Sequence, residues 1–177
     1  AILSLDEVNY INTIVRYIRD TADYLFFMPR LTRHNIVVLG ILDASLGSRI
    51  DGGSQGAMAI GLTNRNTTKF CPVQYSSKKV RRKGSSSFDV ECLTTVECTD
   101  CALIVAMLWE ELTFGPRPSA FQQILLRQAG CEVAQSKIPI ILDTDARDVV
   151  SRIYSIKRSL DVSKRRRIDI ADLQEVL

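Results

Sequence analysis

The sequence is poor in residues and patterns on which several large classes of protein depend. Among its 177 residues there is one histidine, His34, and one tryptophan, Trp109. A catalytic triad needs a histidine base, and His34 precedes the first apolar segment, so we expect no such triad. The longest uninterrupted apolar run, 101–109, is much shorter than the roughly 20 residues of a membrane span. We therefore expect neither a membrane span nor a secretory signal peptide.

The cysteines do not form the pattern of a disulfide framework. There are five, an odd number, without regular spacing, which predicts an intracellular, reducing compartment. Cys98 and Cys101 make a lone CxxC, and Cys92 falls on the same predicted helix. Small apolar core residues are a better interpretation of these three than a zinc or redox site.

Basic residues are concentrated in two short stretches, although the net charge is only +3. Nine of the 23 lysines and arginines lie in 78–83 and 164–167. Clusters of this kind attract phosphate groups. The alternative is that both stretches are solvated loops.

Apolar periodicity and turn residues divide the chain into alternating elements. We expect helices over 4–28, 85–114, 120–130, 147–160 and 166–177, and strands over 35–45, 57–63, 70–77 and 137–146. The first strand should be central, because 36–42 is continuously apolar. Short links predict that the first three strands form an antiparallel meander. The long helix predicts a crossover that brings the fourth strand back parallel to the first. The predicted fold is α/β, with a mixed sheet flanked by helices in 34–177 and an N-terminal helical appendage in 1–33.

Three carboxylates are expected to converge at one edge of this sheet. Asp43 ends the first strand, Asp145 ends the fourth, and Glu91 is expected in the first turn of the long helix. Ligands of such sheets bind outside the carboxyl ends of the strands. Three neighbouring carboxylates need a counter-charge, which Mg²⁺ can supply, and two such ions can promote phosphodiester cleavage. The alternative for Asp43 alone is that it caps a turn.

The chain also carries a series of short motifs in a characteristic order. They are Asp43-Ala44-Ser45, Ser54-Gln55-Gly56, Ser76-Ser77-Lys78-Lys79, the serine-rich start of the helix with Glu91, Thr144-Asp145-Ala146 and "RRIDI" at 166–170. Over almost its whole length the chain resembles the ribonuclease H domain of copia-like LTR-retrotransposon polyproteins. The resemblance implies a ribonuclease H fold that cuts the RNA strand of RNA–DNA hybrids. It implies that Asp43, Glu91 and Asp145 hold two Mg²⁺ ions, and that Lys78, Lys79, Arg81 and Arg82 contact backbone phosphates of the hybrid or of RNA.

The chain departs from that pattern at its end. The family continues past the "RIDI" helix with a fifth strand and a fourth carboxylate, whereas this sequence stops at Leu177, as expected of a C-terminally truncated domain. Asp169 is the nearest candidate to replace the fourth carboxylate. The alternative is that it is an acid near a helix N-terminus, where the helix dipole favours a negative charge. Asp143 alternates with Asp145 and should share its face. Without a fifth strand, 138–142 is an apolar sheet edge that invites another protein subunit.

Two other functions stay open beside the nuclease. A non-catalytic, domesticated remnant could serve as a structural subunit of a larger assembly such as a ribonucleoprotein. A related phosphotransferase of the integrase type is the weaker alternative, because its glutamate is expected late in the chain. The other acids, including Glu110, are expected to be solvated, and Trp109 to lie in the core or in an interface.

Overall fold

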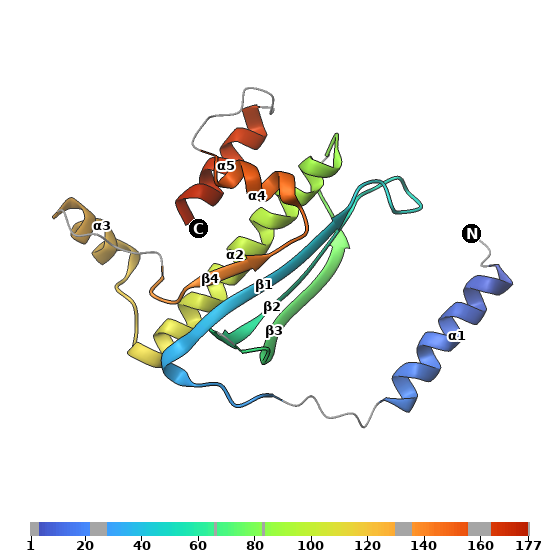
Figure 1. Cartoon of the computed structure of the whole chain (residues 1–177), viewed down its shortest axis with the longest axis horizontal. Coiled ribbons are helices and arrows are strands. Elements are labelled where there is room, and N and C mark those ends of the chain that lie inside the picture. Colours follow the sequence, from blue (N-terminus) through green and yellow to red (C-terminus); the bar gives the residue numbers. More distant parts are fainter. Residues whose placement is uncertain are drawn as a thin grey trace.

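The structure, a computed structural model, describes residues 4–21, 28–65, 67–82, 84–129, 136–155 and 164–176. Its elements are, in chain order, α1 (Leu5–Asp20), the short 3-10 helix η1 (Arg33–Asn35), β1 (Ile36–Ser45), β2 (Gln55–Asn64), β3 (Phe70–Lys79), α2 (Ser87–Phe114), α3 (Ala120–Gln128), β4 (Ile140–Asp143), α4 (Arg147–Ile153) and α5 (Lys164–Val176). Figure 1 shows β1 to β4 together with α2, α4 and α5 as one body, with α1 standing apart from it.

The four strands form one mixed sheet in the order β3-β2-β1-β4. β2 pairs antiparallel with both β1 and β3, while β4 pairs parallel with β1. The predicted α/β architecture is therefore confirmed. β1 is central, as its continuously apolar sequence predicted, and β4 forms an edge of the described sheet.

The main core lies between this sheet and α2. Val38 and Leu42 of β1 and Ile60 of β2 point toward the helix, where they meet buried residues such as Cys98 and Ala102. Successive residues of a strand face opposite sides, so Ile41, between Gly40 and Leu42, lies on the other face and is exposed. Directly paired residues share a face, which places Ala59 and Tyr75 in the same row as Ile41.

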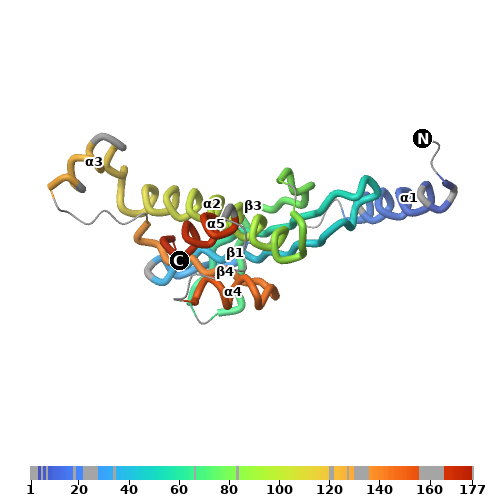
Figure 2. The backbone as a smooth tube through the Cα atoms, turned by 90° about the horizontal axis from the view of Figure 1, so that it is seen from above, coloured from blue at the N-terminus to red at the C-terminus, as the bar shows by residue number. Residues whose placement is uncertain are grey.

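A smaller core joins the three helices of the body. Cys92 of α2 packs with Ala146 and Val149 at the start of α4 and with Ile170 of α5. Figure 2 views the body from above and shows α4 and α5 beside α2. This packing brings the start of α4 to the start of α2, where the predicted site lies.

Several predicted boundaries were wrong. α1 ends at Asp20, with Met28 outside any helix, and the intervening 22–27 lie outside the described residues. β4 covers 140–143 rather than 137–146, because Pro139 precedes it and α4 starts soon after. α4 ends at Ile153, and most of the remainder of the predicted helix 147–160 lies outside the described residues. α3 ends at Gln128, and its expected end at Gly130 also lies outside the described residues.

The prediction that Glu110 is solvated was also wrong. Its side chain is buried, with the residue only 7% exposed. It accepts hydrogen bonds from Arg117 Nη1 at 3.1 Å, Ser136 Oγ at 3.2 Å and the Lys137 amide at 3.1 Å. The chain turns back after α2, which carries Arg117 over the helix end and supplies the partner that a buried carboxylate requires.

α2 is the one described helix that is long and apolar enough to cross a bilayer by length and composition. Half of its most apolar window is buried inside the protein, as is common for the core helix of a folded domain. This is weak support for a span, and the expected absence of a membrane segment stays a prediction.

Candidate active site

Parallel pairing places Asp43 and Asp145 near one another. Ile41 of β1 is in register with Asp143 of β4. Asp43 and Asp145 each lie two residues further along. Asp145 is past the end of β4, while Asp43 lies beyond the pairing with β4 but is still paired with Ala57 of β2, since β1 continues to Ser45 rather than ending at Asp43 as expected. Both side chains are exposed, so the two acids emerge at the carboxyl ends of adjacent parallel strands, where ligands of such sheets bind.

Glu91 approaches this edge from α2. The helix begins after Ser86, whose hydroxyl oxygen accepts the Asp89 amide at 3.2 Å as an N-cap. Its first turn contains Asp89, and Glu91 lies in the next turn rather than in the first as expected. This cap sets where α2 begins and so fixes the position of Glu91 along the helix.

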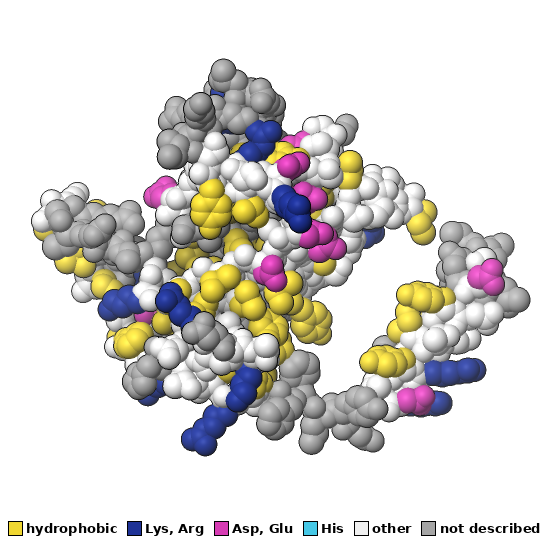
Figure 3. Space-filling model, in the orientation of Figure 1, with side chains coloured by type: hydrophobic (Ala, Val, Ile, Leu, Met, Phe, Trp, Pro, Cys, Tyr) yellow, Lys and Arg dark blue, Asp and Glu magenta, His cyan; other side chains and the backbone are white. Residues whose placement is uncertain are grey.

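The pKa of Glu91 is raised above its usual value. Burial contributes most, followed by the carboxylates of Asp145, Asp148 and Asp43. The structure therefore places Asp145 and Asp43 within electrostatic reach of Glu91. Figure 3 shows acidic side chains gathered on this face, over the region where β1 and β4 end and α2 and α4 begin.

Asp148 is the member of this group that the sequence analysis missed. It lies in the first turn of α4, three residues after Asp145. The packing of Val149 and Ala146 against Cys92 holds that turn beside α2. The i, i+3 spacing of two acids around a helix start was the available signal, because such residues lie on one side of a turn.

The side chains nevertheless do not form a ready metal site. Within the described ranges there is no group of three or more His, Cys, Asp or Glu side chains that could hold a metal ion. Strand alternation gives a reason: Leu42 faces α2, so Asp43 lies on the opposite face of the sheet from the helix that carries Glu91. The donors are chemically suited to Mg²⁺, but their placement here does not fit a shared ion.

The two further acids named from the sequence lie elsewhere. Asp143 is the last residue of β4 and is exposed beside Ile41. Since β4 ends there, the alternation used to place Asp143 and Asp145 on one face does not extend to Asp145. Asp143 is not among the carboxylates that raise the pKa of Glu91.

Asp169 belongs to an ion-pair cluster between α5 and the start of α2. Arg166, only 3% exposed, pairs with both Asp169 and Asp89, the latter at 3.2 Å. Arg82 adds a second cation to Asp169 at 3.2 Å. Although burial opposes it, hydrogen bonds from Ser85 hold the pKa of Asp89 below its usual value. The cluster fastens α5 to α2 at Asp89, two residues before Glu91.

The predicted phosphate contacts line a groove beside α2. The cavity measures about 310 Å³, and its walls include Lys78, Lys79, Arg81 and Arg82 together with Glu97 and Asp100. Lys78 is paired with Glu97. Lys79 is paired with Asp51 at 2.6 Å, and this hydrogen bond lowers the pKa of Asp51 to about 2.

Three of these four basic residues are thus already paired with acids of the same chain. Arg81 is exposed at the groove. A phosphate would have to compete for Lys78, Lys79 and Arg82. The pairs of Lys78 and Lys79 are exposed and therefore weak, at about 0–1 kcal/mol each, whereas Arg82 is paired with the buried Asp169.

The cysteines behave as core residues. The four in the described part of the chain are free thiols, and Cys92 and Cys98 are buried. Burial raises the pKa of Cys92 to about 11 and that of Cys98 to about 12. Protonated, buried thiols are poor nucleophiles and metal ligands, which agrees with the interpretation of these two as small apolar residues.

Comparisons of the chain with protein-family models, with curated proteins and with solved structures each gave no match. The resemblance to ribonuclease H domains of retroelements therefore stays a prediction from the motifs. The strand order and the electrostatic influence of Asp145, Asp148 and Asp43 on Glu91 are the structural observations that bear on function.

Proposed function

We propose that the chain is a ribonuclease H-like domain that cuts the RNA strand of RNA–DNA hybrids, with Asp43, Glu91 and Asp145 as its catalytic carboxylates. One observation carries the proposal: acids from the ends of two parallel neighbouring strands both raise the pKa of a glutamate on the adjoining helix. Like charges held together oppose folding, and arrangements of this kind concentrate at functional sites.

Two Mg²⁺ ions enter this proposal through the resemblance and through the carboxylate chemistry of the donors. Because the described side chains do not form a three-ligand group, Mg²⁺ dependence is decided by the assay below and not by the geometry.

The groove along α2 supports the choice of a nucleic acid as substrate. It lies between the end of β3 and the first half of α2, the helix that carries Glu91. Contacts from lysine and arginine to backbone phosphates position a duplex without reading its sequence. The exposed Arg81 is the first residue that we expect to contact such a backbone.

Cleavage of a labelled RNA–DNA hybrid with and without Mg²⁺ tests the proposal. We expect Mg²⁺-dependent cutting of the RNA strand, abolished by Asp43→Asn and retained by Asp6→Asn, a matched change on the exposed side of α1. A folded protein that leaves the hybrid intact at millimolar Mg²⁺ would exclude an autonomous nuclease. Equal loss in both variants would show that the substitution acts through stability and not through the site.

A second candidate is a non-catalytic structural subunit, and two observations favour it. Three of the four predicted phosphate contacts are already neutralised by acids of the same chain. β4 also ends the described sheet, with Ile141 exposed, which suits a protein partner that extends the sheet. Hybrid or RNA binding without cleavage, measured by fluorescence anisotropy and weakened by Arg81→Glu, would favour this candidate.

A further inference from the structure

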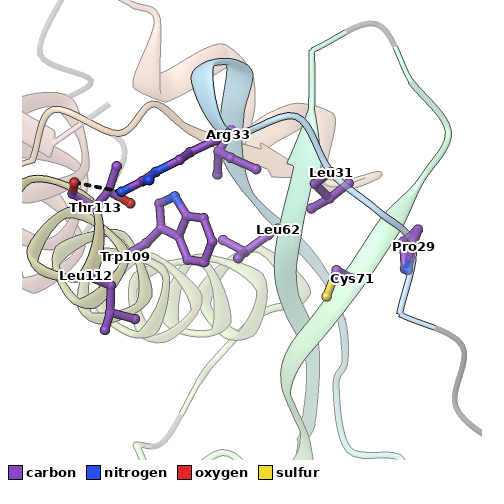
Figure 4. A pocket seen from close by; sticks show the side chains of 9 residues that line it. Pro29, Leu31, Arg33, Leu62, Cys71, Trp109, Leu112 and Thr113 are labelled. Carbon is purple, nitrogen blue, oxygen red and sulfur yellow. Dashed lines mark hydrogen bonds between the residues drawn. The ribbon is translucent and has the colours of Figure 1, made fainter.

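An apolar cavity lies at the far end of α2 from the acids. It measures about 380 Å³ and is lined by Pro29, Leu31, Ile36, Leu62, Cys71 and Leu112, with Arg33, Trp109 and Thr113 completing its wall. Figure 4 shows these side chains converging from the segment before β1, from the sheet and from α2. This volume falls in the range of small-molecule pockets, roughly 300–1,000 Å³, which are apolar with a few placed polar groups.

One of the polar groups in this wall is unsatisfied. The Trp109 indole N–H is buried and has no hydrogen-bond acceptor among the described residues. A buried donor without an acceptor costs about 1–3 kcal/mol, and orphaned groups of this kind are uncommon in folded proteins. Trp109 is partly buried, and its side chain packs against the main core.

The nearest polar neighbour of this indole cannot relieve it. In Figure 4 the nitrogen edge of the Trp109 ring is turned toward the Arg33 side chain. A guanidinium carries five N–H donors and no acceptor. One of them, on Nη2, is given to the Thr113 carbonyl at 3.0 Å, which holds the side chain beside Trp109 in the cavity wall. Two donors, one of them cationic, therefore face one another at the rim of an apolar space.

We propose that this cavity binds a small organic carboxylate with an apolar body. The carboxylate accepts the Trp109 indole N–H and pairs with the Arg33 guanidinium, while the body fills the space between Leu31, Leu62 and Leu112. An anion satisfies both donors at once, whereas a neutral apolar molecule leaves the indole N–H unpaired. Charge-assisted bonds of this type are the strong ones in protein sites.

This site is separate from the carboxylate centre and does not depend on the proposed nuclease. Glu91 and Trp109 are 18 residues apart on the same helix, which at 1.5 Å per residue separates them by about 27 Å. Loss of hybrid cleavage in Asp43→Asn and loss of ligand binding in a variant of this cavity are independent outcomes.

The single tryptophan allows a direct test on the full chain. Phenylbutyrate is titrated against the ¹⁵N-labelled protein while the Trp109 indole cross-peak and the tryptophan fluorescence are followed. We expect saturable changes in both signals, with the indole proton moving downfield as it gains an acceptor. Phenylbutanol, which has the same body without the charge, should bind more weakly.

Two matched arginine variants separate the anion contact from general effects. Arg33→Gln should weaken phenylbutyrate binding by roughly 10- to 100-fold, the loss expected for one charge-assisted contact, and leave phenylbutanol binding unchanged. Arg30→Gln, three residues away and outside the cavity lining, should bind phenylbutyrate like the parent. The proposal is overturned if phenylbutyrate gives no saturable change, if the two variants behave alike, or if Arg33→Gln weakens acid and alcohol equally.

Discussion

Replacement of Gly40 by alanine should disturb the contact between the sheet and α2. A Cβ built at Gly40, in the middle of β1, lies 2.8 Å from Cys98 Sγ and 2.9 Å from Leu142 Cδ2. Both separations are shorter than real Cβ contacts, and Cys98 and Leu142 are packed in or beside the main core. Overpacking of this kind costs about 1–3 kcal/mol, of which the lower entropy of the unfolded alanine chain offsets about 0.4–1 kcal/mol.

Urea unfolding followed by circular dichroism measures this loss in the free energy of unfolding. We expect a net loss of about 1–2 kcal/mol for Gly40→Ala from these two opposing contributions, and a melting temperature lower by about 2–4 °C per kcal/mol for a domain of this size. Gly53→Ala is the matched control, because its Cβ would meet mainly the movable end of Lys79. We expect that control to change stability by no more than about 0.5 kcal/mol.

A double-mutant cycle with Cys98→Ala tests the assigned cause. Removal of the sulfur destabilises the parent by opening a small cavity, but it also gives the new methyl group room. The double variant should therefore lose less than the sum of the single losses, by about 0.5–3 kcal/mol. Additive losses would refute the reasoning, because the sulfur would then not be the atom that Gly40 accommodates.

Three further outcomes follow from the charged groups. Glu91→Gln should stabilise the protein by about 0.2–1 kcal/mol at neutral pH, the scale of exposed charge pairs. Because the pKa of Glu91 is raised in the folded protein, this gain in stability should vanish below the pKa of the unfolded glutamate. Melting temperatures measured across this pH range would show it. Arg166→Met should cost about 3–5 kcal/mol in urea unfolding, because it removes a buried cation that pairs with both Asp89 and Asp169, of which, among the described residues, only Asp169 keeps another cation, Arg82. The exposed Arg167→Met should be nearly neutral; equal effects would contradict this. Lys79→Met should raise the pKa of Asp51 from about 2 toward 3.8, as a carboxylate NMR titration would measure. In the parent protein the pKa of Asp51 is depressed by folding. The stability that ionised Asp51 contributes is therefore present above pH 3.8 and is lost as the pH falls through about 2.

The sequence by itself determined the elements whose causes are local. The unbroken apolar run at 36–42 required a central strand, and it is the central strand β1. The burial on both faces that the run also predicted is incomplete, because Ile41 is exposed on the face away from α2. Short polar links required the antiparallel meander, and Ser86 fixed the start of α2 through its own hydroxyl. These features depend on backbone sterics, side-chain period and capping within a few residues, so the printed order of residues is enough to predict them.

Only the tertiary structure decided which charged groups meet. Glu110 looked like one more acid on a helix surface, yet the returning chain buries it against Arg117. Asp148 joins the acids around Glu91 because α4 packs on the start of α2, and Asp43 is kept on the opposite sheet face by the alternation of β1. Interactions between side chains distant in sequence depend on distance, burial and dielectric environment, and these are fixed only when the elements pack.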